Sequence, residues 1–244
     1  MRKITIGNHK GGVGKTALVF NLAATLQQRL RVLAVDTDPQ ASLSYVCKVP
    51  IHHPTLADVW GSAGDGIAPQ GAIFTTPYFD LLPASLTLAV AEFSLFGAYG
   101  RERLLANTLA QLAPKYDICL IDTPPALGLY GLNALTAADG VIIATAPETL
   151  AVAGVRLFAQ TIAQTRKRLN PTLTILGLIV NAYDGRIAQH RESLNALQTA
   201  PIPTLATIPR SAAIADSLAN GVPLDKYQPS HKANPIFSTL AQNL

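Results

Sequence analysis

Cysteine is scarce in this 244-residue chain, which holds only two of them, far apart. Cys47 and Cys119 form no CxxC pair and belong to no obvious set of metal ligands, so the sequence offers no cysteine-rich metal site. Cys119 lies in an apolar segment, and we expect it to be a small buried core residue. Two isolated thiols of this kind are typical of a cytosolic protein that keeps its cysteines reduced.

Long apolar runs are also lacking. The longest ones, such as residues 118–121, are far too short to cross a bilayer. Residues 1–6 run directly into a strand-like pattern, without the apolar stretch and small-residue cleavage site of a secretory signal. Repeats, low-complexity tracts and linkers are absent as well. We therefore expect a single domain, residues 1–244, in the cytoplasm.

The charge balance is mildly basic, with a net charge of +4 and a pI of about 9.1. Residues 1–122 carry ten Lys or Arg and nine Asp or Glu, and residues 123–244 carry nine and six, so the second half holds +3 of the +4. This excess permits contact with nucleic acid or an anionic surface. It is equally compatible with ordinary solubility.

Apolar, β-rich segments alternate with amphipathic ones along the whole chain. Strands are predicted near residues 3–8, 32–36, 79–82, 117–122, 140–145, 174–181 and 203–207. Helices are predicted near residues 15–29, 99–113, 129–138, 150–169, 187–198, 211–220 and 232–242. Several strands, such as residues 141–144, are apolar almost throughout, which is typical of parallel strands covered on both faces. The pattern predicts a doubly wound α/β fold with a mostly parallel sheet and helices on both faces. Residues 50–78 are the least regular part, and we expect a surface excursion or a variable insertion there.

A glycine-rich segment after the first strand carries the clearest chemical signal. It reads His9-Lys10-Gly11-Gly12-Val13-Gly14-Lys15-Thr16 and opens a predicted helix. Glycines let a backbone approach a phosphate chain closely, and the N–H groups at a helix start face the anion. Lys15 is placed to reach the terminal phosphates, and the Thr16 hydroxyl can bind Mg²⁺. The predicted nucleotide-binding residues are Gly11, Gly12, Val13, Gly14, Lys15, Thr16 and Ala17.

This segment departs from the usual G-x-x-x-x-G-K-[ST] loop at its first position, where the chain has His9. The lysine that follows, Lys10, makes it the deviant Walker A pattern K-G-G-x-G-K-[ST].

Three acidic residues end two of the predicted strands. Asp36 and Asp38 stand at the end of the second strand, and Asp122 ends the apolar strand near residues 117–122. The carboxyl ends of parallel strands are where ligands bind in such folds. Asp122 suits a Mg²⁺ role, Asp36 is placed to support the metal, and Asp38 to hold the attacking water. Because alternate residues on a strand point to opposite faces, it stays open whether Asp36 and Asp38 both face the site.

With these motifs the chain resembles the ParA/MinD family of deviant Walker A P-loop ATPases over nearly its whole length. The resemblance continues through residues 132–135, 176–177, Asn181 and 208–210. It implies ATP and Mg²⁺ as cofactors and an ATP-dependent homodimer in which Lys10 reaches the partner's nucleotide. It also implies that Asp38 activates the water and that four residues lie by the adenine: Asn181, Ile208, Pro209 and Arg210. Lys10, Lys15 and Asp38 are thus the expected catalytic residues, and Thr16, Asp36 and Asp122 the expected metal site.

Within this family, the chain is more similar to ParA-like than to MinD-like members. Residues 232–244 carry one basic residue and a short apolar stripe, so we expect a helix docked on the core and no membrane contact. ParA-like members bind DNA without sequence preference, and the candidate residues here are Arg156, Arg166, Lys167, Arg168, Arg186, Arg191 and Arg210. An alternative role for residues 166–168 is to complement the negative end of a helix dipole. An alternative for Arg186 and Arg191 is a solvated helix face without a partner. The basic residue that ParA-like chains often have three positions after Arg210 is replaced by Ala213.

The resemblance leaves the cargo open. Lys10 comes early, as in the short form of the family, which leaves transcriptional control to a partner. Expected functions are plasmid or chromosome partition, or carboxysome positioning as in McdA-like members, with a ParB-like or McdB-like adaptor and a nucleoid-associated location. Two alternatives stay open: a metabolic P-loop enzyme of the cobyrinate-amidating or dethiobiotin-forming kind, and a MinD-like membrane-bound ATPase.

Overall fold

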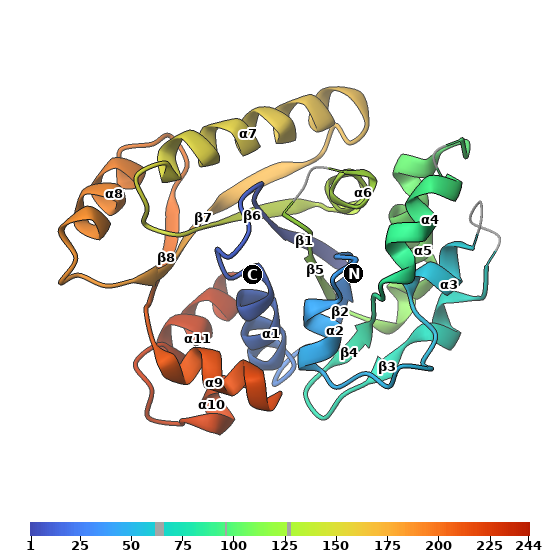
Figure 1. The fold of residues 1–244 in the computed structure, drawn as a ribbon, viewed down its shortest axis with the longest axis horizontal. Coiled ribbons are helices and arrows are strands. Elements are labelled where there is room, and N and C mark those ends of the chain that lie inside the picture. The colour runs from blue at the N-terminus through green and yellow to red at the C-terminus, as the bar shows by residue number, and fades with distance from the viewer. Residues whose placement is uncertain (62–65, 96, 126–127) are drawn as a thin grey trace.

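The computed structural model describes residues 1–61, 66–95, 97–125 and 128–244. Its strands form one sheet of eight in the order β3-β4-β2-β5-β1-β6-β7-β8 (Figure 1). The pairings are parallel except for β3 with β4. The strands are β1 (Arg2–Gly7), β2 (Val32–Asp36), β3 (Phe74–Thr75), β4 (Asp80–Leu82), β5 (Ile118–Asp122), β6 (Gly140–Thr145), β7 (Thr174–Tyr183) and β8 (Thr204–Pro209).

Helices cover both faces of this sheet. One face carries α1 (Lys15–Leu26), α9 (Ala212–Asn220), α10 (Leu224–Tyr227) and α11 (Asn234–Asn243). The other carries α3 (Leu56–Trp60), α4 (Thr87–Leu95), α5 (Leu104–Leu112), α6 (Leu129–Ala137), α7 (Ala151–Arg168) and α8 (Ala188–Gln198). The short helix α2 (Ser42–Val46) follows β2. The predicted doubly wound α/β fold is confirmed.

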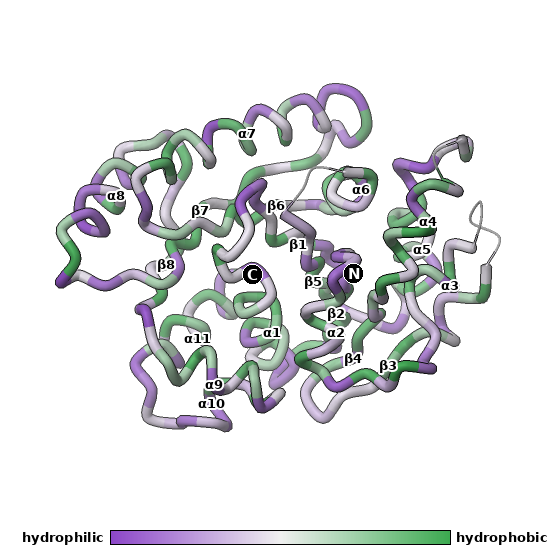
Figure 2. The backbone as a smooth tube through the Cα atoms, viewed as in Figure 1, coloured by the Kyte–Doolittle hydropathy of each residue, from purple (hydrophilic) through white to green (hydrophobic). Residues whose placement is uncertain are grey.

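The alternation of side chains along the strands builds these two cores. In β5, Leu120 packs toward α1, while Cys119 and Ile121 pack toward the opposite helices. All residues of β2, β5 and β6 are buried, as expected for strands covered on both faces. Figure 2 shows hydrophobic residues along the central strands, whereas hydrophilic and hydrophobic residues alternate along the outer helix α7. Cys119 is fully buried, as predicted.

The expectation for residues 50–78 is wrong for much of that segment. Leu56, Val59 and Trp60 of α3 lie in the core. The Trp60 ring stacks on Tyr130 at 5.8 Å, and its indole N–H donates to Thr108 Oγ1 at 3.1 Å. Helix α3 is only five residues long, so periodicity does not reveal it. Residues 62–65 of this segment lie outside the described residues.

The C-terminal helix docks on the core, as expected. Phe237, Leu240 and Ala241 are buried against the cluster that contains α1, and Arg29 Nη2 donates to the Ala241 carbonyl at 2.9 Å. In the part of the chain that the structure describes, every helix is too short or too polar to cross a bilayer.

Candidate functional site

The residues predicted to bind the phosphates and the metal meet at the carboxyl edge of the sheet. Strand β1 leads directly into the phosphate loop, residues 9–16, and its Ile6 pairs with Asp122 of β5. Asp122 in turn pairs with Asp36 at the end of β2. Because β5 lies between β1 and β2, the loop and two of the acids are brought to one place by strand order alone.

The phosphate loop has the backbone that its glycines allow. Gly12 and Gly14 have φ angles of 74° and 86°, in the left-handed region that favours glycine. A Cβ on Gly12 would meet nothing within 4 Å, so this part of the loop borders open space. A Cβ on Gly14 would lie 2.0 Å from Asn181 Nδ2, so a larger residue is excluded there. Helix α1 begins at the next residue, Lys15, and Ala17 lies in its first turn, so its free N–H groups face the loop.

Packed residues hold the two ends of this loop. Asn8 Nδ2 donates to the Ala144 carbonyl of β6 at 2.6 Å, and Asn8 Oδ1 accepts from the Lys10 N–H at 3.0 Å. At the other end, Val13 is buried and its carbonyl accepts from Asn181 Nδ2 at 2.9 Å. Lys10, Gly11 and Gly12 between them are exposed.

Lys15 points along the inside of the loop. Its Nζ donates to the Lys10 carbonyl at 3.2 Å, and the side chain is almost fully buried. Burial lowers the pKa of Lys15, while the charges of Asp122 and Asp38 act in the opposite direction. A phosphate bound in the loop would add negative charge beside Nζ and so favour its protonated form.

Thr16 and Asp122 form the part of the site that fits a magnesium ion. The Thr16 hydroxyl donates to Asp122 Oδ2 at 2.6 Å. The other oxygen, Oδ1, is buried and has no hydrogen-bond partner among the described residues. Burial, and then the charge of Asp36, raise the pKa of Asp122 well above its ordinary value. An orphaned carboxylate oxygen next to a hydroxyl suits a hard cation, whose charge would lower that pKa.

Asp36 lies behind this pair and is fully buried. Its Oδ2 accepts from the N–H and the hydroxyl of Ser44 at 2.9 and 2.8 Å, and its Oδ1 accepts from the Asp38 N–H at 3.1 Å. Burial raises the pKa of Asp36 to about 6, although these hydrogen bonds oppose the shift. Strand β2 ends at Asp36 and Asp38 lies beyond it, so the alternation of side chains along a strand does not place the two acids on opposite faces. Asp38 follows two residues after β2 ends, and its N–H is held by Asp36 Oδ1, so it also lies at the carboxyl edge of the sheet.

Two site residues were not predicted from the sequence. Ser44, on α2, holds Asp36 through both of its polar groups. Glu148, in the turn after β6, forms an ion pair with the Lys10 ammonium, and both side chains are half exposed. The turn is tied to α8, since the Glu148 carbonyl accepts from Ser193 Oγ at 2.9 Å and Thr149 Oγ1 accepts from Gln189 Nε2 at 2.6 Å.

The residues predicted to contact adenine lie at the carboxyl ends of β7 and β8. Ile208 is fully buried, and Pro209 ends β8. The Arg210 N–H donates to the Tyr183 carbonyl at 2.8 Å, which fixes the chain leaving β8. Asn181 contacts the loop, as described above. These four residues thus share the edge of the sheet that holds the phosphate loop, and their contact with adenine stays a prediction.

The candidate DNA-binding residues fall into separate groups. Arg166, Lys167 and Arg168 are exposed in the last turn of α7. Arg191, on α8, lies by the opposite end of α7, where α8 contacts the turn before that helix (Figure 1). Arg186 lies before α8 begins at Ala188, so it does not share a helical face with Arg191; it forms a two-bond ion pair with Asp184. Arg156 is exposed nearer the start of α7.

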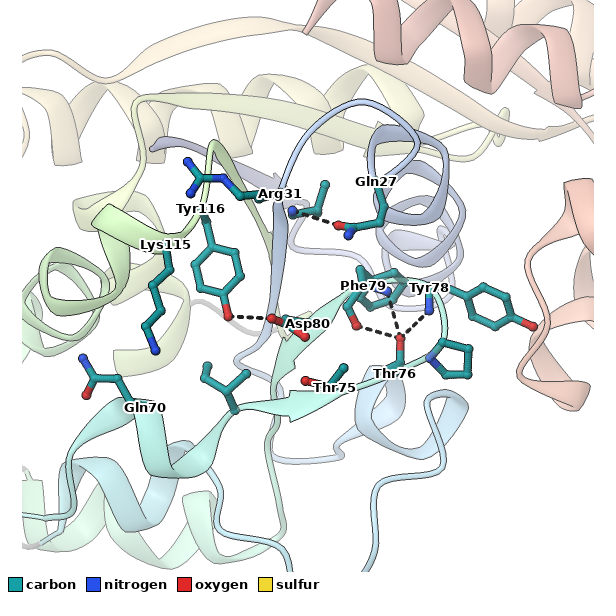
Figure 3. A pocket seen from close by; sticks show the side chains of 13 residues that line it. Gln27, Arg31, Gln70, Thr75, Thr76, Tyr78, Phe79, Asp80, Lys115 and Tyr116 are labelled. Atoms are coloured by element: carbon teal, nitrogen blue, oxygen red, sulfur yellow. Dashed lines mark hydrogen bonds between the residues drawn. The ribbon is translucent and has the colours of Figure 1, made fainter.

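A cavity of about 530 Å³ lies elsewhere, at the opposite edge of the sheet (Figure 3). Val32, Asp80 and Tyr116, which line it, stand at or before the amino ends of β2, β4 and β5. The Tyr116 hydroxyl donates to Asp80 Oδ2 at 2.8 Å across this cavity. None of the predicted site residues lines it.

Comparison with known proteins agrees with this site. A family model described as an AAA domain matches residues 1–175. The chromosome-partitioning ATPase Soj of Thermus thermophilus is 33% identical over 247 residues, which cover 100% of this chain and 95% of the relative.

Two solved structures have the same fold. Cobyrinic acid a,c-diamide synthase of Mycobacterium smegmatis, with an ATP analogue and magnesium, has a TM-score of 0.86 at 34% identity, over 99% of this chain and 93% of that one. The septum site-determining protein MinD of Pyrococcus horikoshii, with Mg-ADP, has a TM-score of 0.81 at 31% identity, over 99% and 95%. The loop, the acids and these similarities together show that the chain belongs to the ParA/MinD family of P-loop ATPases.

Proposed function

We propose that the protein is an ATP-driven molecular switch that forms a homodimer around two nucleotides, binds DNA without sequence preference and positions a cargo. The observation that carries this proposal is the place of Lys10. A loop lysine that served only its own nucleotide would point inward, as Lys15 does, whereas Lys10 lies on the exposed tip of the loop and pairs with Glu148. Its charge is therefore available to a phosphate bound by a second copy of the chain.

The site residues divide the work around ATP and Mg²⁺. The backbone of residues 11–14 surrounds the phosphates, and Lys15 and Thr16 contact the phosphates and the metal. Asp122 would hold the metal, and Asp36 fixes the neighbouring backbone through the Asp38 N–H. Asp38 orients the attacking water. Mg²⁺ supplies charge neutralisation for the transferred phosphoryl group.

Hydrolysis then reverses the assembly. Two Lys10 side chains are stabilised across the interface only while both γ-phosphates are present. Loss of that charge loosens the dimer, and Lys10 can return to Glu148 within its own subunit. A DNA-binding surface made by both subunits therefore exists only in the ATP state, and a slow reaction accelerated by a partner acts as a timer.

The cargo is a chromosome, a plasmid or a carboxysome, bound through a ParB-like or McdB-like adaptor. The similarity to Soj supports the first of these. In this proposal the protein is cytoplasmic and associates with the nucleoid through its own DNA-binding surface. The basic residues around α8 are the candidates for that surface because α8 contacts the turn that holds Glu148.

A second candidate function follows from the structure that bears the name of cobyrinic acid a,c-diamide synthase. Amidation with glutamine needs a nucleophilic cysteine. Cys119 is fully buried in β5, and burial raises the pKa of both Cys47 and Cys119. The chain's own cysteines are thus poor nucleophiles, and the switch is favoured.

The test is the mass of the protein in solution with ATP and Mg²⁺, with ADP and without nucleotide. We expect a dimer only with ATP, and we expect Lys10→Ala to remain monomeric while still binding nucleotide. Lys115→Ala, which removes a lysine at the opposite edge of the sheet, is the matched control. A monomer in every state, together with a corrinoid amide detected by mass spectrometry when cobyrinate, glutamine and ATP are supplied, would favour the synthase.

A further inference from the structure

His9 is the one residue of the loop that departs from the usual phosphate-loop pattern, and nothing in the proposed reaction uses it. It stands between Asn8, which is buried, and Lys10, which is exposed. Its own side chain is half-buried. It is therefore the last packed side chain before the exposed tip of the loop.

The His9 ring packs against helix α7. It meets the Phe158 ring edge to face, with centroids 5.0 Å apart and an interplanar angle of 81°. Its Nε2 lies 3.1 Å from Thr161 Oγ1, one helical turn further along α7. Two contacts at successive turns of one helix fix both the position and the rotation of the ring.

The residues around the start of the loop are closely packed, so the His9 ring has little room to move. Phe158 is buried, and a Cβ on Gly7 would lie 2.7 Å from its ring. The Thr123 hydroxyl, in the segment after Asp122, donates to the Ile6 carbonyl at 3.0 Å on the same side. Helix α7 thus touches the end of β1 and the start of the loop through one compact cluster.

The two residues that directly follow Lys10 offer little restraint, and the later contact is from Lys15 Nζ to the Lys10 carbonyl. Gly11 and Gly12 are exposed, Gly12 has a left-handed backbone, and neither has a side chain to pack. The Lys10 backbone is held on the other side, where its N–H donates to Asn8 Oδ1. The backbone of Lys10 is therefore held by Asn8 on one side and by Lys15 on the other, and its side chain pairs with Glu148. His9 is the neighbouring side chain that ties this backbone to α7.

The charge state of His9 suits this location. Burial lowers the pKa of His9, and the charge of Lys15 lowers it further. A neutral ring can hydrogen-bond Thr161 without adding a third positive charge to a loop that already holds Lys10 and Lys15.

We propose that His9 is a positioning residue for Lys10, which uses its contacts with Phe158 and Thr161 to fix the start of the phosphate loop to α7. This inference rests on the proposed role of Lys10 across the dimer. It adds that His9 ties the Lys10 backbone to α7, so that the start of the loop is already fixed before the dimer forms and only the Lys10 side chain has to move from Glu148 to the partner's nucleotide.

The experiment compares His9→Ala, His9→Gln and Thr161→Val with the parent protein and with Lys10→Ala. Gln keeps a hydrogen-bonding group near the position of Nε2, and Val keeps the shape of Thr161 without its hydroxyl. For each variant, the dimer dissociation constant with ATP and Mg²⁺, the ATP affinity of the monomer, kcat and the melting temperature are measured. Gln160→Ala, exposed on the same helix, is the control.

We expect His9→Ala to weaken the ATP-dependent dimer about tenfold or more, the effect of losing about one part-buried hydrogen bond and one ring contact. Monomer ATP affinity should stay near the parent value, and the melting temperature should fall by only about 2–4 °C, because the lost contacts also support the fold of the subunit. We expect His9→Gln to restore most of the dimer, and Thr161→Val to show a defect that adds nothing to His9→Ala in the double variant.

Three other results would contradict the inference or its basis. Parent-like dimers in His9→Ala, with Lys10→Ala monomeric, would overturn the role of His9 alone. If ATP affinity, dimer affinity and melting temperature all fall to the same extent in His9→Ala and His9→Gln, His9 has only a structural role. ATP-dependent dimers in Lys10→Ala would overturn the proposed function itself.

Discussion

Asp36 and Asp122 lie directly opposite one another on β2 and β5, and both are buried at the carboxyl edge of the sheet. Two carboxylates in this arrangement repel each other, and the charge of Asp36 raises the pKa of Asp122. Such a pair costs stability in the absence of a cation. We interpret that cost as the preparation of a site that binds magnesium, because the metal supplies the missing positive charge.

The pair makes the stability of the nucleotide-free protein depend on pH. An Asp side chain in an unfolded chain has a pKa of about 3.9, whereas the pKa of Asp36 in the fold is about 6. Between these two pKa values the folded state binds more protons than the unfolded state. The stabilisation that comes from protonated Asp36 is therefore fully present below about pH 3.9 and is lost as the pH rises through about 6. We expect the melting temperature to fall from about pH 4 to pH 6 for this reason, and Asp36→Asn to flatten that slope.

The exposed acid Asp216 provides the control for this experiment. Asp216→Asn should leave the slope unchanged. If Asp36→Asn retains the full pH dependence, Asp36 is not the group that titrates.

Ser44 should matter for stability as well as for the site. Its hydroxyl donates to Asp36 Oδ2 and accepts from the Ala84 N–H at 2.9 Å. Ser44→Ala would leave a buried donor and a buried carboxylate without this partner, at a cost of about 1–3 kcal/mol. The measurement is denaturant unfolding without nucleotide. Ser42→Ala, exposed on the same helix, should be near neutral, and equal stability of the two variants would count against the Ser44 contact.

Asp38 is the residue predicted to hold the attacking water. Asp38→Ala should lower ATP turnover about 100-fold or more, within the usual range for a general base or water-positioning residue. ATP binding and dimer formation should persist, so the variant accumulates as an ATP-bound dimer. Turnover is followed by phosphate release, and dimer lifetime by sizing after ATP is removed. Turnover at the parent rate would remove Asp38 from this role; Asp216→Ala should behave as the parent does.

We expect Arg186 and Arg191 to contribute to DNA binding in the ATP state. Gln189 and Ser193 tie the segment that carries Arg186 and Arg191 to the turn at residues 148–149, whereas residues 166–168 lie in the last turn of α7. Replacing Arg186 and Arg191 by Ala should weaken DNA binding in the ATP state and reduce the salt slope by about 1 for each lost phosphate contact. If the salt dependence of DNA affinity is unchanged in this double variant, the DNA-binding surface lies elsewhere. Lys115→Ala should leave both quantities unchanged.

Local sequence predicted much of the fold and the nucleotide site. The loop and the acids are read from short motifs, and β5 and β6 from unbroken apolar runs. Strand order then brought Asp36 beside Asp122, as parallel sheets require. The role of Glu148 could not be read in this way, because its partner Lys10 lies 138 residues earlier and meets it only through the pairing of β1 with β6.

Other features were missed for different physical reasons. Helix α4 is apolar on its exposed side as well, with Val90 and Phe93 facing outward, so it shows no amphipathic period. Helix α3 is too short for periodicity, and its signal is local: Thr55 and Asp58 form a capping box at its start. Ser44 gives no signal at all in one sequence, since its importance comes from Asp36 being buried beside it.

The most direct test of the proposed switch is binding of a random-sequence DNA duplex with ATP and Mg²⁺, with ADP and without nucleotide, over a series of salt concentrations. We expect tight binding only with ATP, with an affinity that falls steeply as salt is raised. Binding that is the same in all three states, or absent in all of them while ATP-dependent dimers still form, would contradict the proposed switch.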